Sequence, residues 1–199
     1  MTIDRSRFAQ GLTYEGFKEQ MTRNRDRFEE NEGRVAIAPA DLAAFRALPA
    51  AIHVAVLAED WCGDVIANLP VLGRLAKESG KLDVRVFLRD QNDDIMQSYL
   101  NQGKYKSIPV FIFFDEAFKE LGHWIERPAS VTDLRARRRA AVYAAHPEFG
   151  AADAPVDQLP EDVRGRLQAE IQRVRDETTT FANGEVVREL RELLTRVAA

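Results

Sequence analysis

Two apolar segments with different spacing meet at the stretch Ala58-Glu59-Asp60-Trp61-Cys62-Gly63-Asp64-Val65. The segment before it, residues 52–58, is short and rich in valine and alanine with one isoleucine, which is typical of a buried strand. After it, residues 63–79 carry apolar side chains every three or four positions, which predicts an amphipathic helix ended by Gly80. Cys62 is therefore expected at a strand-to-helix turn. There the unpaired N–H groups and the positive end of the helix dipole favour a thiolate over a thiol.

The turn Trp61-Cys62-Gly63-Asp64-Val65 resembles the W-C-G-P-C active-site turn of the thioredoxin family. A second similarity lies in Tyr105-Lys106-Ser107-Ile108-Pro109 and the apolar run that follows it, which resemble the family's cis-proline loop and next strand. Between them, Asp90-Gln91-Asn92 follows a valine-rich strand, where thioredoxins carry a similar turn. The resemblance runs from about residue 52 to residue 126, less than half of the chain, and implies a thioredoxin-like fold.

The chain departs from the thioredoxin pattern at three positions. Val65 stands where the family has its second cysteine, Asp64 stands in place of the proline, and Val56 replaces a buried carboxylate. Because Cys62 is the only cysteine, it cannot close an intramolecular disulfide. Dithiol reduction of a substrate by this chain acting alone is therefore excluded.

Acidic residues surround the cysteine in the sequence, namely Glu59, Asp60 and Asp64. A helix-end dipole contributes about 0.3–1 kcal/mol at an exposed site. One carboxylate a few ångströms away, at an intermediate dielectric, contributes a comparable or larger amount of the opposite sign. We therefore expect the Cys62 thiol to be less acidic than that of thioredoxin.

Composition and charge limit the class of protein. The chain has 199 residues, of which 45% are hydrophobic and 30% charged, as in soluble globular proteins. Its net charge of −4 argues against general binding to nucleic acids or anionic membranes. No stretch approaches the roughly 20 apolar residues of a membrane span, and the N-terminus leads into no signal-peptide core. With one cysteine and no disulfide framework, we expect a cytoplasmic protein.

The predicted fold class is α/β, with a thioredoxin-like mixed sheet flanked by helices and with helical extensions at both ends. The predicted core elements are, in order, strand 52–58, helix 63–79, strand 82–88, helix 94–101, strand 110–114 and strand 120–126. The first four alternate, which implies parallel pairing through a right-handed crossover. The last two form an antiparallel hairpin.

We expect three regions: an N-terminal helical extension at residues 1–50, the thioredoxin-like core at 51–128, and C-terminal helices at 129–199. The extension is predicted to contain one helix over residues 13–30 and a second that begins near residue 39 and stops at Pro49. Both are expected to cover one face or edge of the sheet.

The C-terminal region is predicted to hold a helix over residues 131–145, a loop over 148–160, and two further helices. The last of them is expected to start after a break at Asn183-Gly184. The basic cluster at residues 135–139 is interpreted as a solvated or salt-bridged face rather than an anion or RNA site. The apolar stripes of the last two helices fit packing on the core, pairing with each other, or contact with a second subunit.

No metal or other cofactor is expected. The three histidines, at positions 53, 123 and 146, are far apart in the sequence and give no zinc spacing with the single cysteine. Monothiol glutaredoxins bind iron–sulfur clusters, but their C-G-F-S turn does not resemble Cys62-Gly63-Asp64-Val65. We therefore disfavour cluster binding.

The resemblance implies a site around Cys62. In the related fold the proline, here Pro109, is cis and lies beside the active-site turn, which leaves the backbone of Ile108 free to pair with an extended peptide. Cys62 is the candidate catalytic residue. The candidate substrate-binding residues are Trp61, Gly63, Asp64, Ile108 and Pro109.

Two functions stay open at this point. The first is monothiol thiol–disulfide exchange, in which Cys62 reacts and an external thiol, such as glutathione or a protein cysteine, resolves the product. The second is a binding module that keeps the groove at Trp61 and Pro109 for an extended peptide or protein partner. A glutathione transferase-like protein is a third alternative, although the C-terminal part is short for that fold. The expected partners are a protein or a low-molecular-weight thiol or disulfide, with no nucleic acid and no membrane, and the sequence leaves the oligomeric state open.

Overall fold

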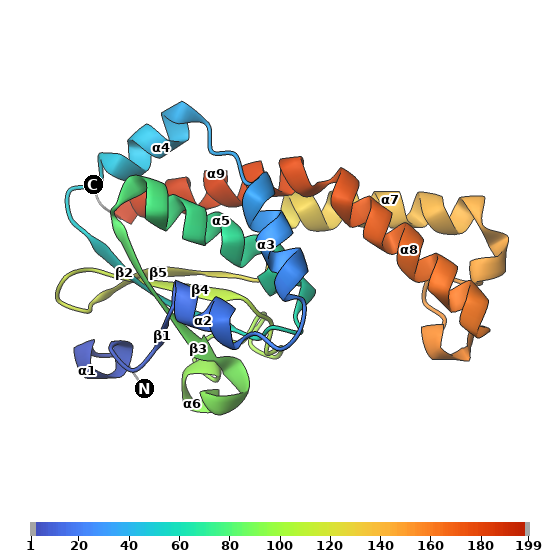
Figure 1. The fold of residues 1–199 in the computed structure, drawn as a ribbon, viewed down its shortest axis with the longest axis horizontal. Coiled ribbons are helices and arrows are strands. Elements are labelled where there is room, and N and C mark those ends of the chain that lie inside the picture. Colours follow the sequence, from blue (N-terminus) through green and yellow to red (C-terminus); the bar gives the residue numbers. More distant parts are fainter. Residues whose placement is uncertain (1–2, 198–199) are drawn as a thin grey trace. The chain divides into compact units, whose positions relative to one another are not determined.

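A computed structural model describes residues 3–197 of the chain, which form two compact units (Figure 1). The second unit is the continuous segment Pro128–Glu185. The first unit combines the residues before this segment with those after it, and it contains the sheet and the candidate site. No helix among residues 3–197 is long and apolar enough to cross a membrane.

The first unit is built on a five-stranded mixed sheet with the order β1-β3-β2-β4-β5. Strand β2 (Ile52–Ala58) runs parallel to β3 (Leu82–Leu88) and antiparallel to β4 (Val110–Phe114). Strand β5 (Glu120–Ile125) pairs antiparallel with β4 and completes the hairpin. The predicted α/β fold with a mixed sheet is confirmed. A two-residue edge strand, β1 (Leu12–Thr13), pairs antiparallel with β3 and was not predicted.

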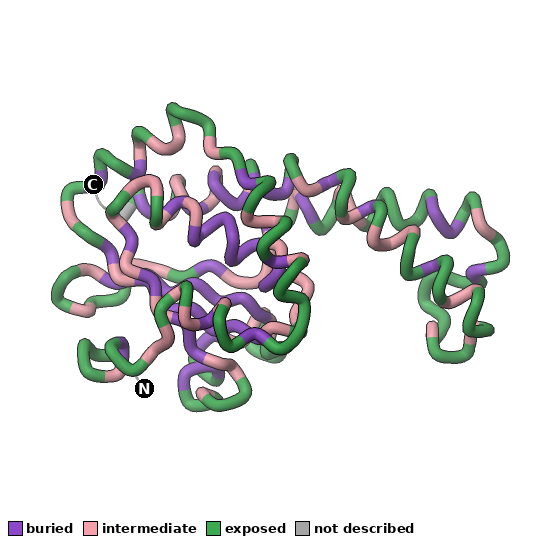
Figure 2. Tube along the Cα trace, in the orientation of Figure 1, coloured by how far each residue is buried: buried purple, intermediate pink, exposed green. Residues whose placement is uncertain are grey.

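The central strands are buried on both faces because their side chains are apolar at successive positions. Every residue of β4 is buried, and in β2 only His53 is partly exposed. Helix α5 (Gly63–Ser79) follows β2, presents an apolar face to the sheet and ends at Gly80, whose φ of 67° lies in the left-handed region that glycine adopts without strain. Figure 2 shows the buried segments gathered at the sheet and α5.

Proline interrupts the hydrogen bonding of α5. Pro70 lies inside the helix and has no N–H to donate to the carbonyl of Ile66, four residues earlier. The side chain of Asn31 supplies the missing donor, because its Nδ2 lies 2.9 Å from that carbonyl oxygen. Asn31 belongs to α3 (Arg25–Arg34), which packs against α5.

The N-terminal part is more segmented than predicted. It contains α1 (Arg5–Phe8), α2 (Tyr14–Gln20), α3 and α4 (Pro39–Arg46). The single helix expected over residues 13–30 is wrong, because the chain breaks between α2 and α3. There the backbone N–H groups of Thr22 and Arg23 donate to the Asp60 carboxylate at 2.7 and 3.0 Å, and Asn24 has a φ of 57°.

The helix predicted over residues 94–101 is also shorter in the structure. A 3-10 turn, η1 (Arg89–Gln91), leads into α6 (Asp93–Met96). Beyond α6 the backbone makes tighter turns, and Asn101 pairs with Tyr105 across a loop that contains Gly103 at a φ of 68°. This loop leads directly to Pro109.

The second unit consists of helices with their own small core. It contains α7 (Ala129–Ala145), the 3-10 turns η2 (Pro147–Phe149) and η3 (Val156–Gln158), and α8 (Glu161–Glu177). The buried apolar residues of this core are Val142, Tyr143, Phe149, Leu167 and Val174.

The final helix, α9 (Thr179–Val197), starts earlier than predicted. The expected break at Asn183-Gly184 is wrong, because the helix continues through both residues and the chain turns instead at Thr178. Asn183 is buried, so packing overrides its low helix propensity. From Val186 onward α9 belongs to the first unit, where its apolar residues Val186, Val187, Leu190 and Leu194 join the main core. Figure 1 shows this part of α9 on the same side of the sheet as α5.

Candidate functional site

Cys62 is the N-cap residue of α5, directly after the turn that follows β2. Its thiol makes no capping hydrogen bond but donates to the carbonyl oxygen of Ile108, with 3.5 Å between Sγ and the oxygen. The Ile108–Pro109 peptide bond is cis, and both residues are buried. The two loops singled out in the sequence therefore meet at the sulfur atom.

Burial raises the pKa of the Cys62 thiol above its ordinary value. The backbone N–H groups of Val65 and Asp64 at the helix N-terminus oppose this rise, and so does the positive charge of Arg89. The Asp64 carboxylate adds to it. The hydrogen bond to Ile108 also favours the thiol, since only the protonated sulfur can donate. Burial and the hydrogen bond to Ile108 therefore both favour the thiol over the thiolate.

The three carboxylates near the cysteine in sequence have different roles. Asp60 accepts hydrogen bonds from the loop between α2 and α3 and so connects this loop to the turn that contains Cys62. Glu59 is 8% exposed and accepts a hydrogen bond from the N–H of Asp90 at 2.8 Å. Asp64 is the carboxylate that faces the thiol site, on the first turn of α5.

An arginine neutralises Asp64. Arg127, which follows β5, forms an ion pair with the Asp64 carboxylate and a second one with Glu126. The adjacent backbone is tied to α5 as well, because buried Asn68 donates to the carbonyl oxygen of Glu126 at 2.8 Å. These contacts join the end of β5 to the start of the helix beside Cys62.

Trp61 is one of the more exposed large apolar side chains, at 43%. The guanidinium of Arg89 lies 4.8 Å from the centre of its ring, within the range of a cation–π contact. Arg89 also donates to the carbonyl oxygen of Lys106 at 3.3 Å, in the loop before Pro109. The indole and the proline loop therefore share one cationic neighbour.

The predicted site residues lie close together around the turn. Gly63 is the first residue of α5, Asp64 is in its first turn, and Ile108 contacts the sulfur. The sequence interpretation missed Arg89 and Arg127. A signal existed for one supporting residue, since Asn68 is a polar residue within the apolar run of α5 and is 3% exposed.

The resolving position of a dithiol site is occupied by a hydrocarbon side chain. Val65 is fully buried in the main core, and Val56 is fully buried at the position of the family's carboxylate. Among residues 3–197 no group of three or more His, Cys, Asp or Glu side chains is arranged to hold a metal ion. Chemistry at this turn by this chain's own groups therefore rests on one sulfur.

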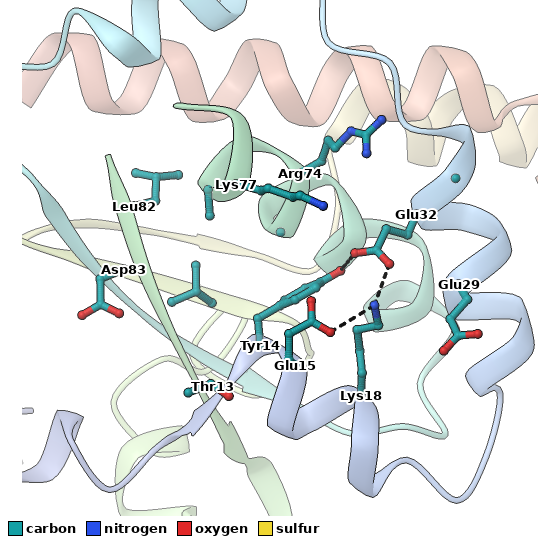
Figure 3. A pocket seen from close by; sticks show the side chains of 14 residues that line it. Thr13, Tyr14, Glu15, Lys18, Glu29, Glu32, Arg74, Lys77, Leu82 and Asp83 are labelled. Atoms are coloured by element: carbon teal, nitrogen blue, oxygen red, sulfur yellow. Dashed lines mark hydrogen bonds and ion pairs between the residues drawn. The ribbon is translucent and has the colours of Figure 1, made fainter. Parts of the chain in front are cut away.

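A separate cavity of about 620 Å³ lies between α2, α3, α5 and β3 (Figure 3). Tyr14 and Lys18 both contact the Glu32 carboxylate, at 2.9 and 2.8 Å, and Lys18 also pairs with Glu15. Figure 3 shows these four side chains joined at the cavity wall. The cavity contains none of the predicted site residues, and this network holds its wall together.

The fold and the turn define a thioredoxin-like protein. A family model described as thioredoxin matches residues 11–141. Because the match takes in more than half of the chain, the chain belongs to the thioredoxin family.

Two solved structures share the fold at low sequence identity. A protein of unknown function from Pseudomonas aeruginosa is 19% identical with a TM-score of 0.61, over 86% of this chain and 98% of the other. An HIV epitope-scaffold protein is 15% identical with a TM-score of 0.65, over 98% of this chain and 99% of the other. No curated protein sequence matches the chain. These similarities establish the fold and no activity.

Proposed function

We propose that the protein carries out monothiol thiol–disulfide exchange through Cys62. The Cys62 thiolate attacks one sulfur of a disulfide, a mixed disulfide forms, and the other sulfur leaves as a thiolate. An external thiol, either a low-molecular-weight thiol such as glutathione or a protein cysteine, then attacks the mixed disulfide and releases Cys62 as a thiolate. Each step makes one S–S bond and breaks one, so that no further oxidant or reductant is needed. The cytoplasm, which is rich in such thiols, is the compartment that suits this cycle.

The observation that carries the proposal is the contact between Cys62 and Ile108. The sulfur lies 3.5 Å from the Ile108 carbonyl oxygen, at the first turn of a 17-residue helix. An extended substrate that paired with the backbone of Ile108 would bring its own sulfur beside Sγ. The proposed substrate-binding residues are Trp61, Gly63, Asp64, Ile108 and Pro109.

The raised thiol pKa fits exchange that is slow at neutral pH and accelerates in alkali. Only the thiolate reacts, and its intrinsic nucleophilicity increases with pKa, which partly compensates for its low population. The test is to follow the release of thiol from a mixed disulfide of glutathione by the purified protein between pH 6 and about 10. We expect a rate that rises with pH in the wild type and is absent in Cys62→Ser. Equal rates in the two proteins would contradict the proposal.

A specific observation favours a second function, a binding module without a redox cycle. Val65, which fills the resolving position, is fully buried, and burial raises the pKa of the Cys62 thiol. In this case the groove between Trp61 and Pro109 recognises an extended peptide or protein segment, and the sulfur only fills space. Cys62→Ala would then keep partner binding, whereas Trp61→Ala would reduce it. Under the first function, Cys62→Ala abolishes exchange.

A further inference from the structure

Arg127 is held near Cys62 by polar contacts from several elements. Its guanidinium pairs with Asp64 on α5 and, at 2.5 Å, with the neighbouring Glu126. The Asn101 side chain donates to the other Glu126 carboxylate oxygen at 2.9 Å. The backbone N–H of Glu126 donates to the Pro109 carbonyl oxygen at 2.8 Å. The residue before Arg127 is therefore fixed to the proline loop.

The backbone at this point is unusual. Glu126 has a φ of 66°, in the left-handed region that residues with a side chain rarely adopt. The buried Asn68 amide, which bonds its carbonyl oxygen, helps to hold this conformation. A strained residue held from several sides directs the following arginine toward the start of α5.

The charged groups that act on Cys62 come from three elements. Asp64 is on α5, Arg89 is on η1, and Arg127 follows β5. Arg89 is already engaged, because it pairs with Asp90 and lies over Trp61. Arg127 forms an ion pair directly with Asp64.

The state of Arg127 agrees with this arrangement. Burial lowers the pKa of its guanidinium, but the Asp64 carboxylate outweighs that effect. The negative charges of Glu126 and of an ionised Cys62 add to the rise. The observed contact of the guanidinium is with Asp64, on the first turn of the helix that Cys62 caps.

We propose that Arg127 is a positioning residue that controls the reactivity of Cys62 by neutralising Asp64. With the ion pair intact, the positive charge of Arg127 offsets part of the repulsion between the Asp64 carboxylate and a thiolate at Cys62, so that more of the attraction of the helix N-terminus remains. Without Arg127, this positive charge is lost, and the Asp64 carboxylate suppresses the ionisation of the sulfur more strongly. The inference deepens the proposed exchange function and rests on it for its biological use, but the charge coupling itself is measurable on the thiol alone.

The test is the pH dependence of Cys62 alkylation by iodoacetamide in four proteins: wild type, Arg127→Gln, Asp64→Asn and the double variant. A charge within about 4–6 Å changes a pKa by about one pH unit or more. We therefore expect Arg127→Gln to raise the midpoint of the profile by about one pH unit, which lowers the alkylation rate near neutral pH roughly tenfold. Asp64→Asn should lower the midpoint, and the double variant should lie near the wild type.

Two further variants separate this effect from a purely structural one. Arg127→Lys keeps the charge and should retain the wild-type midpoint to within a few tenths of a unit. Arg191→Gln breaks a comparable ion pair with Asp41, 2.6 Å long and located on α9 and α4, and should leave the midpoint unchanged. Denaturant unfolding of every variant reports any structural role. If Arg127→Gln does not fold, the double variant should still have a higher midpoint than Asp64→Asn, because the two proteins differ only in the charge of Arg127; equal midpoints would overturn the inference.

The inference is overturned if neither Arg127→Gln nor Asp64→Asn moves the midpoint, or if the double variant retains the full shift of Arg127→Gln. Absence of disulfide exchange in the wild type, with the alkylation midpoints shifted as expected, would overturn the proposed function and leave the role of Arg127 intact. Disulfide exchange in the wild type, with alkylation midpoints that do not differ among the variants, would support the proposed function and overturn the role of Arg127.

Discussion

The side-chain amide of Asn31 replaces the backbone N–H that Pro70 lacks. It donates to the carbonyl oxygen of Ile66 at 2.9 Å, from a neighbouring helix. Proline inside a helix usually leaves such a carbonyl without its donor, and a partly buried carbonyl without a donor is costly. Helix α5, which carries Cys62, therefore depends on α3 for the hydrogen bonding of its middle turn.

This dependence predicts an energetic coupling between Asn31 and Pro70. Asn31→Ala should lower the free energy of unfolding by about 1–3 kcal/mol, measured by urea denaturation. In a Pro70→Ala background the restored N–H can donate to Ile66, and the same change should cost clearly less. Gln97→Ala, which removes an exposed amide bonded to Asp93 at 3.2 Å, serves as the control and should cost little. If Asn31→Ala lowered the free energy of unfolding equally in both backgrounds, the Asn31 amide would not be replacing the N–H that Pro70 lacks.

Close packing between Gly73 and Tyr14 predicts a destabilising glycine-to-alanine change. A Cβ at Gly73 would lie 2.3 Å from Cζ of Tyr14, whose hydroxyl is bonded to Glu32 and so cannot move freely. Gly73→Ala should reduce the free energy of unfolding by about 1–3 kcal/mol. Gly33 in α3 has open space around it, and Gly33→Ala should be neutral or stabilising by up to about 1 kcal/mol. A stabilising Gly73→Ala would show that the ring does not pack there.

The carboxylate of Glu32 predicts a pH-dependent contribution to stability. Burial raises the pKa of Glu32, but hydrogen bonds from Lys18 and Tyr14 outweigh it, so the pKa in the folded protein is lowered. A lowered pKa contributes stability above the unfolded value of about 4.3, and this contribution is lost as the pH falls through the folded value. The difference between wild type and Glu32→Gln should be about 1–3 kcal/mol at pH 7 and should shrink below about pH 4. Denaturant unfolding at both pH values measures it.

A control for this pH effect is available on the same lysine. Glu15 also pairs with Lys18, but its side chain is 70% exposed and the distance is 3.4 Å. Glu15→Gln should change the free energy of unfolding by less than about 1 kcal/mol. If the difference in free energy of unfolding between wild type and Glu32→Gln stayed constant below about pH 4, Glu32 would not be acting as an ionised carboxylate in the folded protein.

The contribution of α9 to the main core is testable with one leucine. Leu190 is fully buried, and Leu190→Ala should cost about 2–5 kcal/mol through lost burial and a cavity. Thr195→Ala on the exposed side of the same helix should change stability by no more than about 0.5 kcal/mol. Thermal or urea unfolding distinguishes the two. If Leu190→Ala lowered the free energy of unfolding by less than about 1 kcal/mol, α9 would not contribute to the main core as described.

Local sequence patterns were sufficient for the elements whose burial is continuous. The strands around His53 and Phe111 and the helix that ends at Gly80 have the predicted bounds because runs of apolar residues and a glycine stop specify them. The break between α2 and α3 could not be predicted in the same way. The break depends on Asp60, whose carboxylate accepts hydrogen bonds from the N–H groups of Thr22 and Arg23, 38 and 37 residues earlier in the chain.

The candidate site shows the same distinction. Cys62 and Pro109 were identifiable from their motifs, whereas Arg127 was not, because its ion pair with Asp64 joins residues 63 positions apart. Asn183 shows the opposite error. Its sequence context favours a helix break, but burial of the asparagine within α9 overrides that local preference.

The return of α9 to the main core also has a consequence for biosynthesis. The strands of the sheet emerge from the ribosome early, but Leu190 and Leu194, which complete their apolar covering, emerge only after the whole second unit. In a nascent chain, part of the apolar surface of the sheet therefore stays uncovered until these leucines have emerged. A chain that stalls before them would be a substrate for chaperones or proteases, even though every residue of the cysteine turn and the proline loop had already been made.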